Sequence, residues 1–240
     1  MPYIKILLLT LFALTILTVN CFAYWDGGYA GLTGGYESGN AKIFPAEHQK
    51  ISSKWSTSNS LVGDFTFKGA KGEVLLGYGK TIGKYYLGGE ASTTVYRSQG
   101  KAKHTSWDGL SGAHTMLSLR VLRNESFSIS FGGGYKINDE TLLYIKPGIS
   151  STKFNFTLVN RNDRDSEGNF IAGSSKRFNG LTLELGVEMR IHERFLLRVG
   201  GSHTFYRRKF FTAEETQCSK IRFIPQATQV KTGIIIPLFV

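Results

Sequence analysis

The sequence predicts an all-β protein, an eight-stranded antiparallel up-and-down transmembrane β-barrel. Three observations carry this prediction. Apolar and polar residues alternate over several segments of about ten residues, tight and long connections alternate between these segments, and no run after residue 24 is apolar enough to span a membrane as a helix. A ten-stranded barrel, which would recruit residues 61–68 and 114–122 as further strands, is the alternative.

The composition agrees with a sheet whose residues alternate between two environments. The chain has 240 residues, of which 28 are Gly, 17 Phe and 11 Tyr, and its mean hydropathy is slightly negative. Its formal net charge is +11, but the Lys and Arg residues are dispersed and no nucleic-acid motif accompanies them. We therefore expect no nucleic-acid partner, and anionic lipid or lipopolysaccharide as the acidic partner.

Residues 179–206 give the clearest pattern. Apolar Leu181, Leu183 and Leu185, followed by Val187 and Met189, alternate with polar residues and glycine. Because successive side chains of a strand point to opposite faces, this segment has one apolar and one polar face. His192-Glu193 then makes a short turn into a second alternating strand, and the two strands form a hairpin.

The other strands follow the same rule. They are expected at residues 28–38, 72–81, 85–96, 127–137, 141–156 and 229–240. Tight joints at 82–84, 138–140 and 192–193 alternate with polar gaps at 39–71, 97–113, 157–177 and 207–228. Residues 114–122 are also strand-like, and we interpret them as a β-extension above the membrane or as the upper end of an unusually long fourth strand.

Charged residues of both signs lie on the polar face of these strands. A soluble sandwich would expose them, whereas a small barrel fills its interior with side chains, so that charges inside it must pair. We expect lumen ion pairs, for example of Glu184 or Glu188 with Arg198 or Lys146. The full set of expected lumen charges is Glu73, Glu90, Lys146, Glu184, Glu188, Arg190 and Arg198.

The last ten residues carry a specific pattern. A polar residue, a Gly two positions later and apolar residues at alternate positions resemble the C-terminal signal that the barrel-assembly machinery recognises. The residues concerned are Lys231, Gly233, Ile234, Ile236, Leu238 and Phe239. The chain departs from that signal because Phe239 is penultimate and Pro237 interrupts the strand's donors.

Together these segments resemble the OmpA-like and opacity-type outer-membrane β-barrels of Gram-negative bacteria. The resemblance covers the chain from residue 24 to its end, and residues 134–148, a strand, a tight turn and a strand, carry it best. It implies a cell outer-membrane location and a structural or surface-interaction role of adhesion or immunogenic type, through long extracellular loops that contact a host or cell-surface ligand. A small-solute porin is the alternative.

The N-terminus predicts export. Lys5 followed by an apolar run over residues 6–19 is typical of a signal peptide, and small residues at Cys21 and Ala23 place cleavage after Ala23. Residues 1–23 would then be removed and residues 24–240 would form the barrel domain. Cys218 would remain as a lone cysteine, either an incidental loop thiol or the site of an intermolecular bridge.

The sequence predicts no enzyme, no cofactor and no metal site. A lipid A deacylase needs a Ser two residues after its His, but Phe205 follows His203 at that spacing, so a lipid-modifying enzyme is a weaker alternative. Residues 163–168 imitate the start of a calcium loop, but Ser174 stands where its Glu should be. We expect lipopolysaccharide contacts at Arg207, Arg208 and Lys209. Interface girdles are expected from Tyr85, Tyr144, Phe154, Phe156, Phe195, Phe205 and Tyr206.

Overall fold

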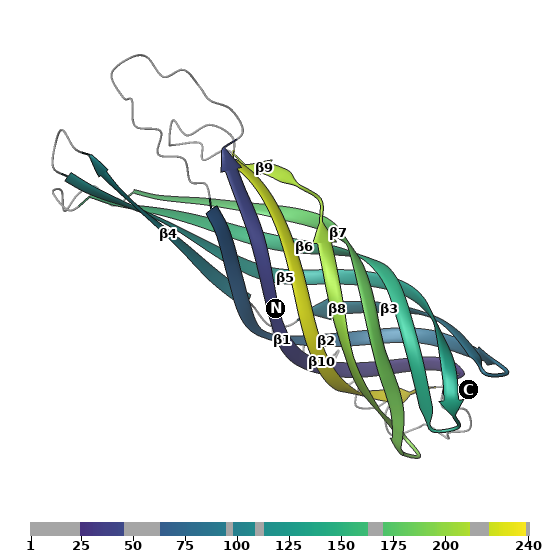
Figure 1. Ribbon diagram of the computed structural model, residues 1–240. Helices are drawn as coiled ribbons and strands as arrows, with labels where there is room; N and C mark the ends of the chain where they lie inside the picture. The colour runs from purple at the N-terminus through teal and green to yellow at the C-terminus, as the bar shows by residue number, and fades with distance from the viewer. Residues whose placement is uncertain are drawn as a thin grey trace, which may run out of the picture.

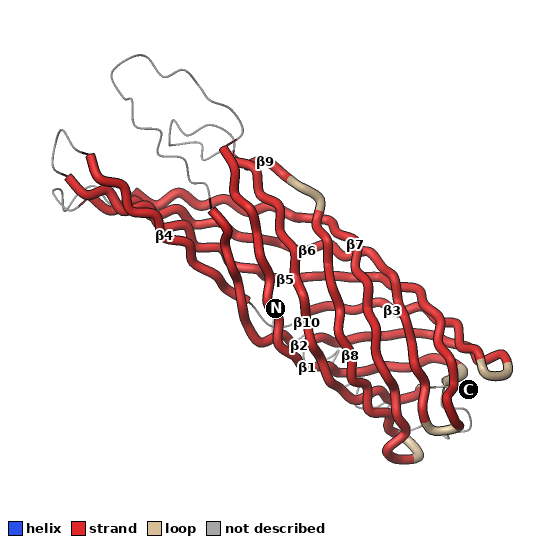
Figure 2. Tube along the Cα trace, in the orientation of Figure 1, coloured by secondary structure: helices blue, strands red, loops and turns tan. Residues whose placement is uncertain are grey.

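The computed structural model describes residues 25–45, 63–94, 98–108, 113–162, 170–211 and 221–238. Within these ranges the chain is built of antiparallel strands in one continuous wall (Figure 1, Figure 2). No helix in this part of the chain is long and apolar enough to cross a membrane. The strands are β1 (Gly27–Pro45), β2 (Gly63–Ile82), β3 (Tyr85–Thr94), β4 (Ser98–Asp108), β5 (Ala113–Asn138), β6 (Thr141–Asn162), β7 (Phe170–His192), β8 (Phe195–Tyr206), β9 (Lys209–Phe211) and β10 (Ile221–Pro237).

The ten strand segments occupy eight positions in a closed ring. β3 and β4 lie end to end against β5, β3 along residues 127–135 and β4 along residues 113–123. β8 and β9 lie end to end against β10 in the same way. β1 pairs with β2 on one side and with β10 on the other, which closes the ring. The predicted eight-stranded antiparallel barrel is therefore confirmed, and the ten-stranded alternative is not adopted.

The three tight joints lie at one end of the barrel, at the lower right of Figure 1. Gly83, in the joint between β2 and β3, has φ +63°, a left-handed conformation that glycine adopts without strain. The two ends of the described chain meet at this same end, where the Leu238 amide donates to the Gly28 carbonyl at 2.7 Å. We call this the turn end and the opposite end the loop end.

The strands are longer than the sequence predicts. β5 has 26 residues, β6 has 22 and β7 has 23, whereas about 9–11 residues suffice to cross a bilayer. The predicted gaps at 97–113 and 157–177 are consequently wrong as gaps, because β4, β5, β6 and β7 continue through most of them. Residues 114–122 belong to the long strand β5, which confirms the second of the two interpretations offered for them, and a bulge between Arg123 and Ser126 marks the level at which β5 passes from β3 to β4.

An apolar band surrounds the outer wall near the turn end. Leu181, Leu183 and Leu185 of β7 are 42–66% exposed, as their predicted lipid-facing position requires. Comparable residues of the other strands complete the band: Leu32, Tyr36, Leu76, Tyr78, Ile82, Tyr85, Leu87, Phe127, Phe131, Tyr135, Leu143, Ile145, Ile149, Val199, Phe205, Val230 and Ile234. On β7 the band runs from Leu181 to Ile191, which is 11 residues and matches one membrane crossing.

Beyond this band the wall reverses its polarity. The outward residues become polar there, as Lys42, Lys68 and Arg177 illustrate. The inward residues become aromatic, and their rings pack edge to face, with centroids 5.2 Å apart for Phe154–Phe178 and 5.0 Å for Phe156–Phe223. We call this the phenylalanine cluster; its members, each at most 3% exposed, are Phe67, Phe154, Phe156, Phe178 and Phe223. The loop-end half of the barrel is thus built like a water-soluble β-protein, with an apolar interior and a polar exterior.

Four of the seven aromatic residues expected in interface girdles lie inside the barrel instead. Tyr144, Phe154, Phe156 and Tyr206 are 0–5% exposed and face the lumen. They occupy even-numbered positions, in phase with Lys146 on β6 and with Arg198 on β8, so the pleat sends them inward. Tyr85 and Phe205, which are more than half exposed, lie on the outer wall as expected.

Candidate functional site

The lumen of the barrel holds a balanced set of buried charges. Strand alternation brings acidic and basic side chains from β1, β2, β3, β5, β6, β7, β8 and β10 to one interior, and each is at most 10% exposed. Among the described residues the acids are Glu37, Glu73, Glu90, Glu184 and Glu188, and the bases are Lys71, Arg123, Lys146, Arg198 and Lys231. Five negative charges therefore face five positive charges, and this set of residues carries no net charge.

Arg198 is the centre of the part of this network that is nearest the turn end. Its Nη1 lies 2.7 Å from Glu90 Oε2, and its Nη2 lies 2.7 Å from Glu188 Oε1. Lys146 Nζ joins the same two carboxylates, at 3.0 Å from Glu90 and 3.7 Å from Glu188. The Tyr29 hydroxyl donates a further hydrogen bond to Glu90 at 3.1 Å. Two carboxylates and two cations thus satisfy one another inside the barrel.

A second layer lies beside the first and is centred on Lys231. Its Nζ is 2.7 Å from Glu184 Oε2 and 3.1 Å from Glu73 Oε2. Glu73 also meets Lys71 Nζ at 2.6 Å, and Glu184 accepts a hydrogen bond from the Tyr144 hydroxyl at 2.9 Å. Because Lys231 is on β10 and its partners are on β2 and β7, this layer spans the ring.

The third layer leads toward the loop end. Arg123 pairs with Glu37, and its Nη2 donates to the Tyr206 hydroxyl at 2.7 Å. Tyr206 also shares a hydrogen bond of 3.1 Å with Thr152, which in turn is 2.8 Å from the Ser126 hydroxyl. This layer connects the ion pairs to the phenylalanine cluster, since the Phe154 and Tyr206 rings are 5.6 Å apart.

Glycines make room for the large inward side chains. A Cβ at Gly77 would lie 2.2 Å from the Tyr29 ring, and one at Gly186 would lie 2.4 Å from the Tyr144 hydroxyl. Such distances are far below contact distance, so the two rings can lie across the lumen only because those positions carry no side chain.

Apolar groups close the lumen at both ends of the charged layers. The turn end is filled by a cluster of Trp25, Tyr29, Leu75, Tyr86, Leu142, Leu196 and Ile235. The phenylalanine cluster fills the opposite end. An eight-stranded barrel is just wide enough for its side chains, and here the charged layers lie between these two apolar clusters.

Six of the seven expected lumen charges lie in this network, and Arg190 does not. Arg190 Nη2 lies 2.5 Å from Glu140 Oε1, with side chains 28% and 61% exposed, at the turn between β5 and β6. Glu188 and Arg190 share a face, but Arg190 is one pleat nearer the end of the barrel and reaches a turn residue there. For Glu184 the partner is Lys231, rather than either of the two bases suggested for it.

Four lumen charges were not predicted from the sequence: Glu37, Lys71, Arg123 and Lys231. Lys71 has the same parity as Glu73 and would have been found if β2 had been extended below residue 72. Arg123 could not be found in this way, because the bulge between Arg123 and Ser126 reverses the parity of β5: odd residues such as Phe127 and Phe131 face outward, whereas Arg123 faces inward. Lys231 belongs to the predicted terminal signal, and its parity with Ile235 also places it inside the ring.

The other predicted site residues lie elsewhere. Ile234 faces outward on β10, Gly233 lies so close to β1 that a Cβ would be 2.2 Å from the Leu32 carbonyl oxygen, and Ile236 and Leu238 are partly exposed. Phe239, Cys218 and the calcium-like segment 163–168 lie outside the described residues, as do residues 1–23.

The three expected lipopolysaccharide contacts follow β8 at the loop end. Arg207 and Arg208 are exposed. Lys209 is partly committed to the protein, because its Nζ donates to the Arg177 carbonyl at 2.5 Å and lies 5.9 Å from the Phe178 ring centroid.

No cluster of His, Cys, Asp and Glu suited to a metal ion occurs in the described ranges. His203 lies on the outer wall, with its Nδ1 2.8 Å from the Thr228 hydroxyl and its ring 4.3 Å from that of Phe205.

A closed eight-stranded ring with a lipid-facing band and a filled lumen is the architecture of small outer-membrane proteins, and the sequence comparison agrees. A family profile described as Outer membrane protein beta-barrel domain matches residues 9–223. The chain belongs to this family. It is an outer-membrane β-barrel protein with transmembrane strands.

Solved structures of other outer-membrane barrels are similar to this chain at low identity. Ail, the attachment invasion locus protein of Yersinia pestis, is 12% identical with a TM-score of 0.37, and Neisserial surface protein A is 12% identical with a TM-score of 0.41; each alignment covers 88% of this chain and 99% of the other. The outer membrane protease OmpT from Escherichia coli is 9% identical with a TM-score of 0.49, covering 92% and 99%. No curated protein matches the chain.

Arg198→Ala should destabilise the barrel strongly, because it leaves Glu90 and Glu188 buried with less compensation. We expect a loss of about 3–5 kcal/mol in the free energy of unfolding. Arg177→Ala is the matched control: its pair with Glu125, at 3.9 Å, is more than half exposed, and we expect a loss below about 1 kcal/mol. Urea unfolding of the refolded protein in vesicles measures both, and equal losses would contradict the central position of Arg198.

Proposed function

We propose that this protein has a structural or surface-interaction role in the outer membrane of a Gram-negative bacterium, of adhesion or immunogenic type, and that it is not an enzyme. The observation that carries the proposal is the loop-end half of the barrel. There β5, β6 and β7 continue past the lipid band with a polar exterior and a phenylalanine interior. A folded extension of this kind presents its loops to a host molecule or a neighbouring cell from a rigid base.

We further propose that the chain reaches this place with a cleaved signal peptide, residues 1–23. The barrel-assembly machinery would then recognise its last strand through Lys231, Gly233, Ile234, Ile236, Leu238 and Phe239. Outer-membrane lipid would surround the apolar band.

Lipopolysaccharide is the proposed partner of the basic residues that follow β8. Arg207 and Arg208 are exposed, and they stand just beyond Phe205 of the apolar band, at the level where phosphate groups of the cell-surface leaflet are expected. Lys209 contributes less, because it is already bonded to the Arg177 carbonyl.

The surface role predicts that binding resides in the loop tips. Replacing residues 109–112 and 163–169 with Gly/Ser runs of equal length leaves every described strand intact, whereas deleting 97–113 would remove β4. Cells that display the full chain should bind host-cell monolayers or other cells, and cells displaying the replaced chain should lose most of that binding. Equal binding at equal surface amounts would contradict the proposal.

The surface role and the porin role differ in what they predict for conductance through the lumen. Under the surface role, the purified protein should give no stable open channels in a planar bilayer, because charged layers and two apolar clusters fill its interior. A barrel that lacks protein-dependent current steps agrees with the surface role. Reproducible step conductance from heat-modifiable, folded protein would favour a small-solute porin.

The proposed lipopolysaccharide contact predicts that reversing these charges weakens binding to lipopolysaccharide. Exchanging Arg207→Glu and Arg208→Glu together should weaken binding to immobilised lipopolysaccharide at least about tenfold at low salt, since each cation near an anionic surface contributes about 1 kcal/mol. Salt should reduce the difference. The control exchanges Lys42→Glu and Lys68→Glu, two exposed residues on β1 and β2; an equal loss in this control would show unspecific attraction only.

A further inference from the structure

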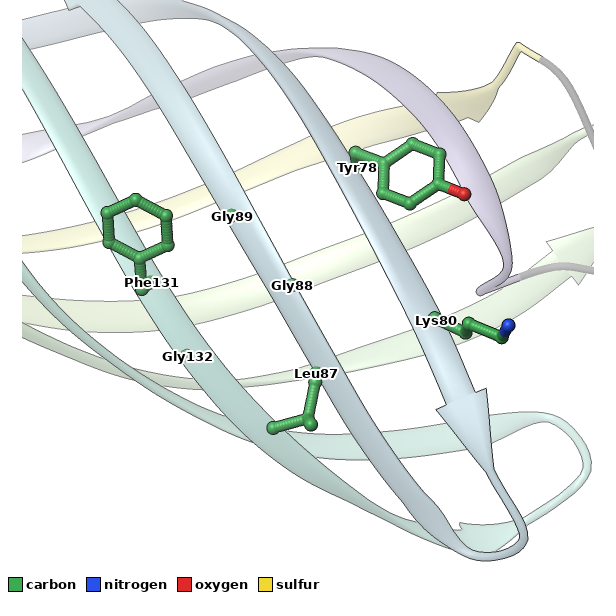
Figure 3. A pocket seen from close by; sticks show the side chains of 7 residues that line it. All are labelled: Tyr78, Lys80, Leu87, Gly88, Gly89, Phe131 and Gly132. Atoms are coloured by element: carbon green, nitrogen blue, oxygen red, sulfur yellow. The ribbon is translucent and has the colours of Figure 1, made fainter.

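A hollow opens on the lipid-facing wall of the barrel, over β2, β3 and β5 (Figure 3). Its volume is about 560 Å³, within the range of about 300–1,000 Å³ that is usual for small-molecule sites. Three of its lining positions are glycines, which carry no side chain. The lining residues are Tyr78, Lys80, Leu87, Gly88, Gly89, Phe131 and Gly132.

The strand register explains the hollow. Tyr78, Gly89 and Phe131 lie in one row across the three strands. Adjacent strands are about 4.8 Å apart, so the Cα atoms of Tyr78 and Phe131 are about 10 Å apart with only glycine between them. The Phe131 ring leans against this bare backbone, because a Cβ at Gly89 would be 3.2 Å from two of its ring atoms. The next row toward the loop end places another small residue, Ala91, between Leu76 and Ile129.

Lys80 stands at the turn-end edge of the hollow, inside the apolar band. It is one pleat from Ile82, or about 7 Å, and Ile82 is opposite Tyr85, whose ring packs against that of Tyr135 at 5.8 Å. Figure 3 shows its side chain on the same outer face as Tyr78 and Phe131. A lysine on the lipid face of a barrel costs about 2–4 kcal/mol at mid-membrane and about 0–1 near the interface.

No acidic group pairs with Lys80 in the part of the chain that the structure describes. The lumen cations behave differently, since each of them meets a carboxylate. An exposed cation that borders an apolar hollow with glycine at its floor can therefore take an anion from outside the protein.

We propose that this hollow binds an anionic glycerophospholipid of the turn-end leaflet, with the phosphate on Lys80 and one acyl chain over Gly89 and Ala91. The order of Lys80 and Gly89 along the membrane normal fits such a lipid. Lys80 is nearer the interface and Gly89 lies deeper, so a chain that begins at the phosphate enters the slot on its way to the middle of the bilayer. Lipopolysaccharide lies in the opposite, cell-surface leaflet, which excludes it as the occupant of a turn-end slot.

Native mass spectrometry of the full barrel, released from detergent, tests this site. The probes are phosphatidylglycerol and phosphatidylcholine with identical acyl chains. The wild-type protein should retain one phosphatidylglycerol in preference to phosphatidylcholine. Lys80→Gln should lower the fraction that carries phosphatidylglycerol about fivefold at equal lipid concentration, and Gly89→Leu, which fills the slot, should lower it as well.

Two variants serve as matched controls. Lys42→Gln removes an exposed lysine at the loop end, and Gly34→Leu adds a side chain at a position where a Cβ would meet nothing within 4 Å. Both should retain the lipid. Equal retention of the two lipids by the wild type, or unchanged retention in Lys80→Gln, overturns the proposal. If Gly89→Leu fails to fold, the Lys80→Gln result decides alone, because that substitution changes only an exposed side chain.

Discussion

Closure of β1 against β10 is the constraint on which the rest of the molecule depends. A sheet inside lipid has no water to satisfy its edge amides and carbonyls, so the ring must close. Once eight strands close, the bore is fixed, and it is just wide enough for side chains. Every inward residue must then fit against the others, and the glycines opposite Tyr29 and Tyr144 are one result. The paired charges are another, because a charged side chain inside so narrow a bore needs a partner of opposite sign.

The reversal of polarity along the strands follows because lipid surrounds one part of the ring and water surrounds the other. Inside the membrane the outer solvent is lipid, so apolar residues face outward and polar residues inward. Beyond the membrane the outer solvent is water, and the hydrophobic effect places Phe154 and Phe178 inside, with Arg177 outside. The layer of Arg123, Thr152 and Tyr206 connects the two parts of the barrel. Toward the loop end the Tyr206 ring packs against Phe154, and toward the turn end Arg123, which is hydrogen-bonded to Tyr206, belongs to the ion pairs. One barrel therefore has two kinds of core, and its outer half requires no lipid.

The sequence predicted the eight-stranded ring, the lipid-facing leucines of β7 and the charges at Glu90, Glu184 and Arg198, because these depend on parity and on turn spacing alone. It did not predict the length of β5 to β7. Polar outward residues such as Ser175 and Arg177 look like a loop when each strand is expected to keep one polarity throughout. The parity of Phe154 and Phe156 is visible in the sequence, yet the same expectation of one polarity per strand predicts them in the membrane girdles. Partners across the lumen, such as Lys231 with Glu184, depend on register between distant strands, which local sequence does not contain.

Lys231 links the formation of the ring to the content of the lumen. It lies on the last strand, within the segment expected to act as the assembly signal, and its partners Glu73 and Glu184 lie on β2 and β7. A lysine alone in that lumen would carry a desolvation cost of several kcal/mol, whereas two carboxylates already in place offset that cost. The reverse holds for Glu73 and Glu184, each of which needs the cation that β10 supplies. Insertion of β10 beside β1 therefore closes the backbone ring and neutralises the lumen in the same step, and each of these events favours the other.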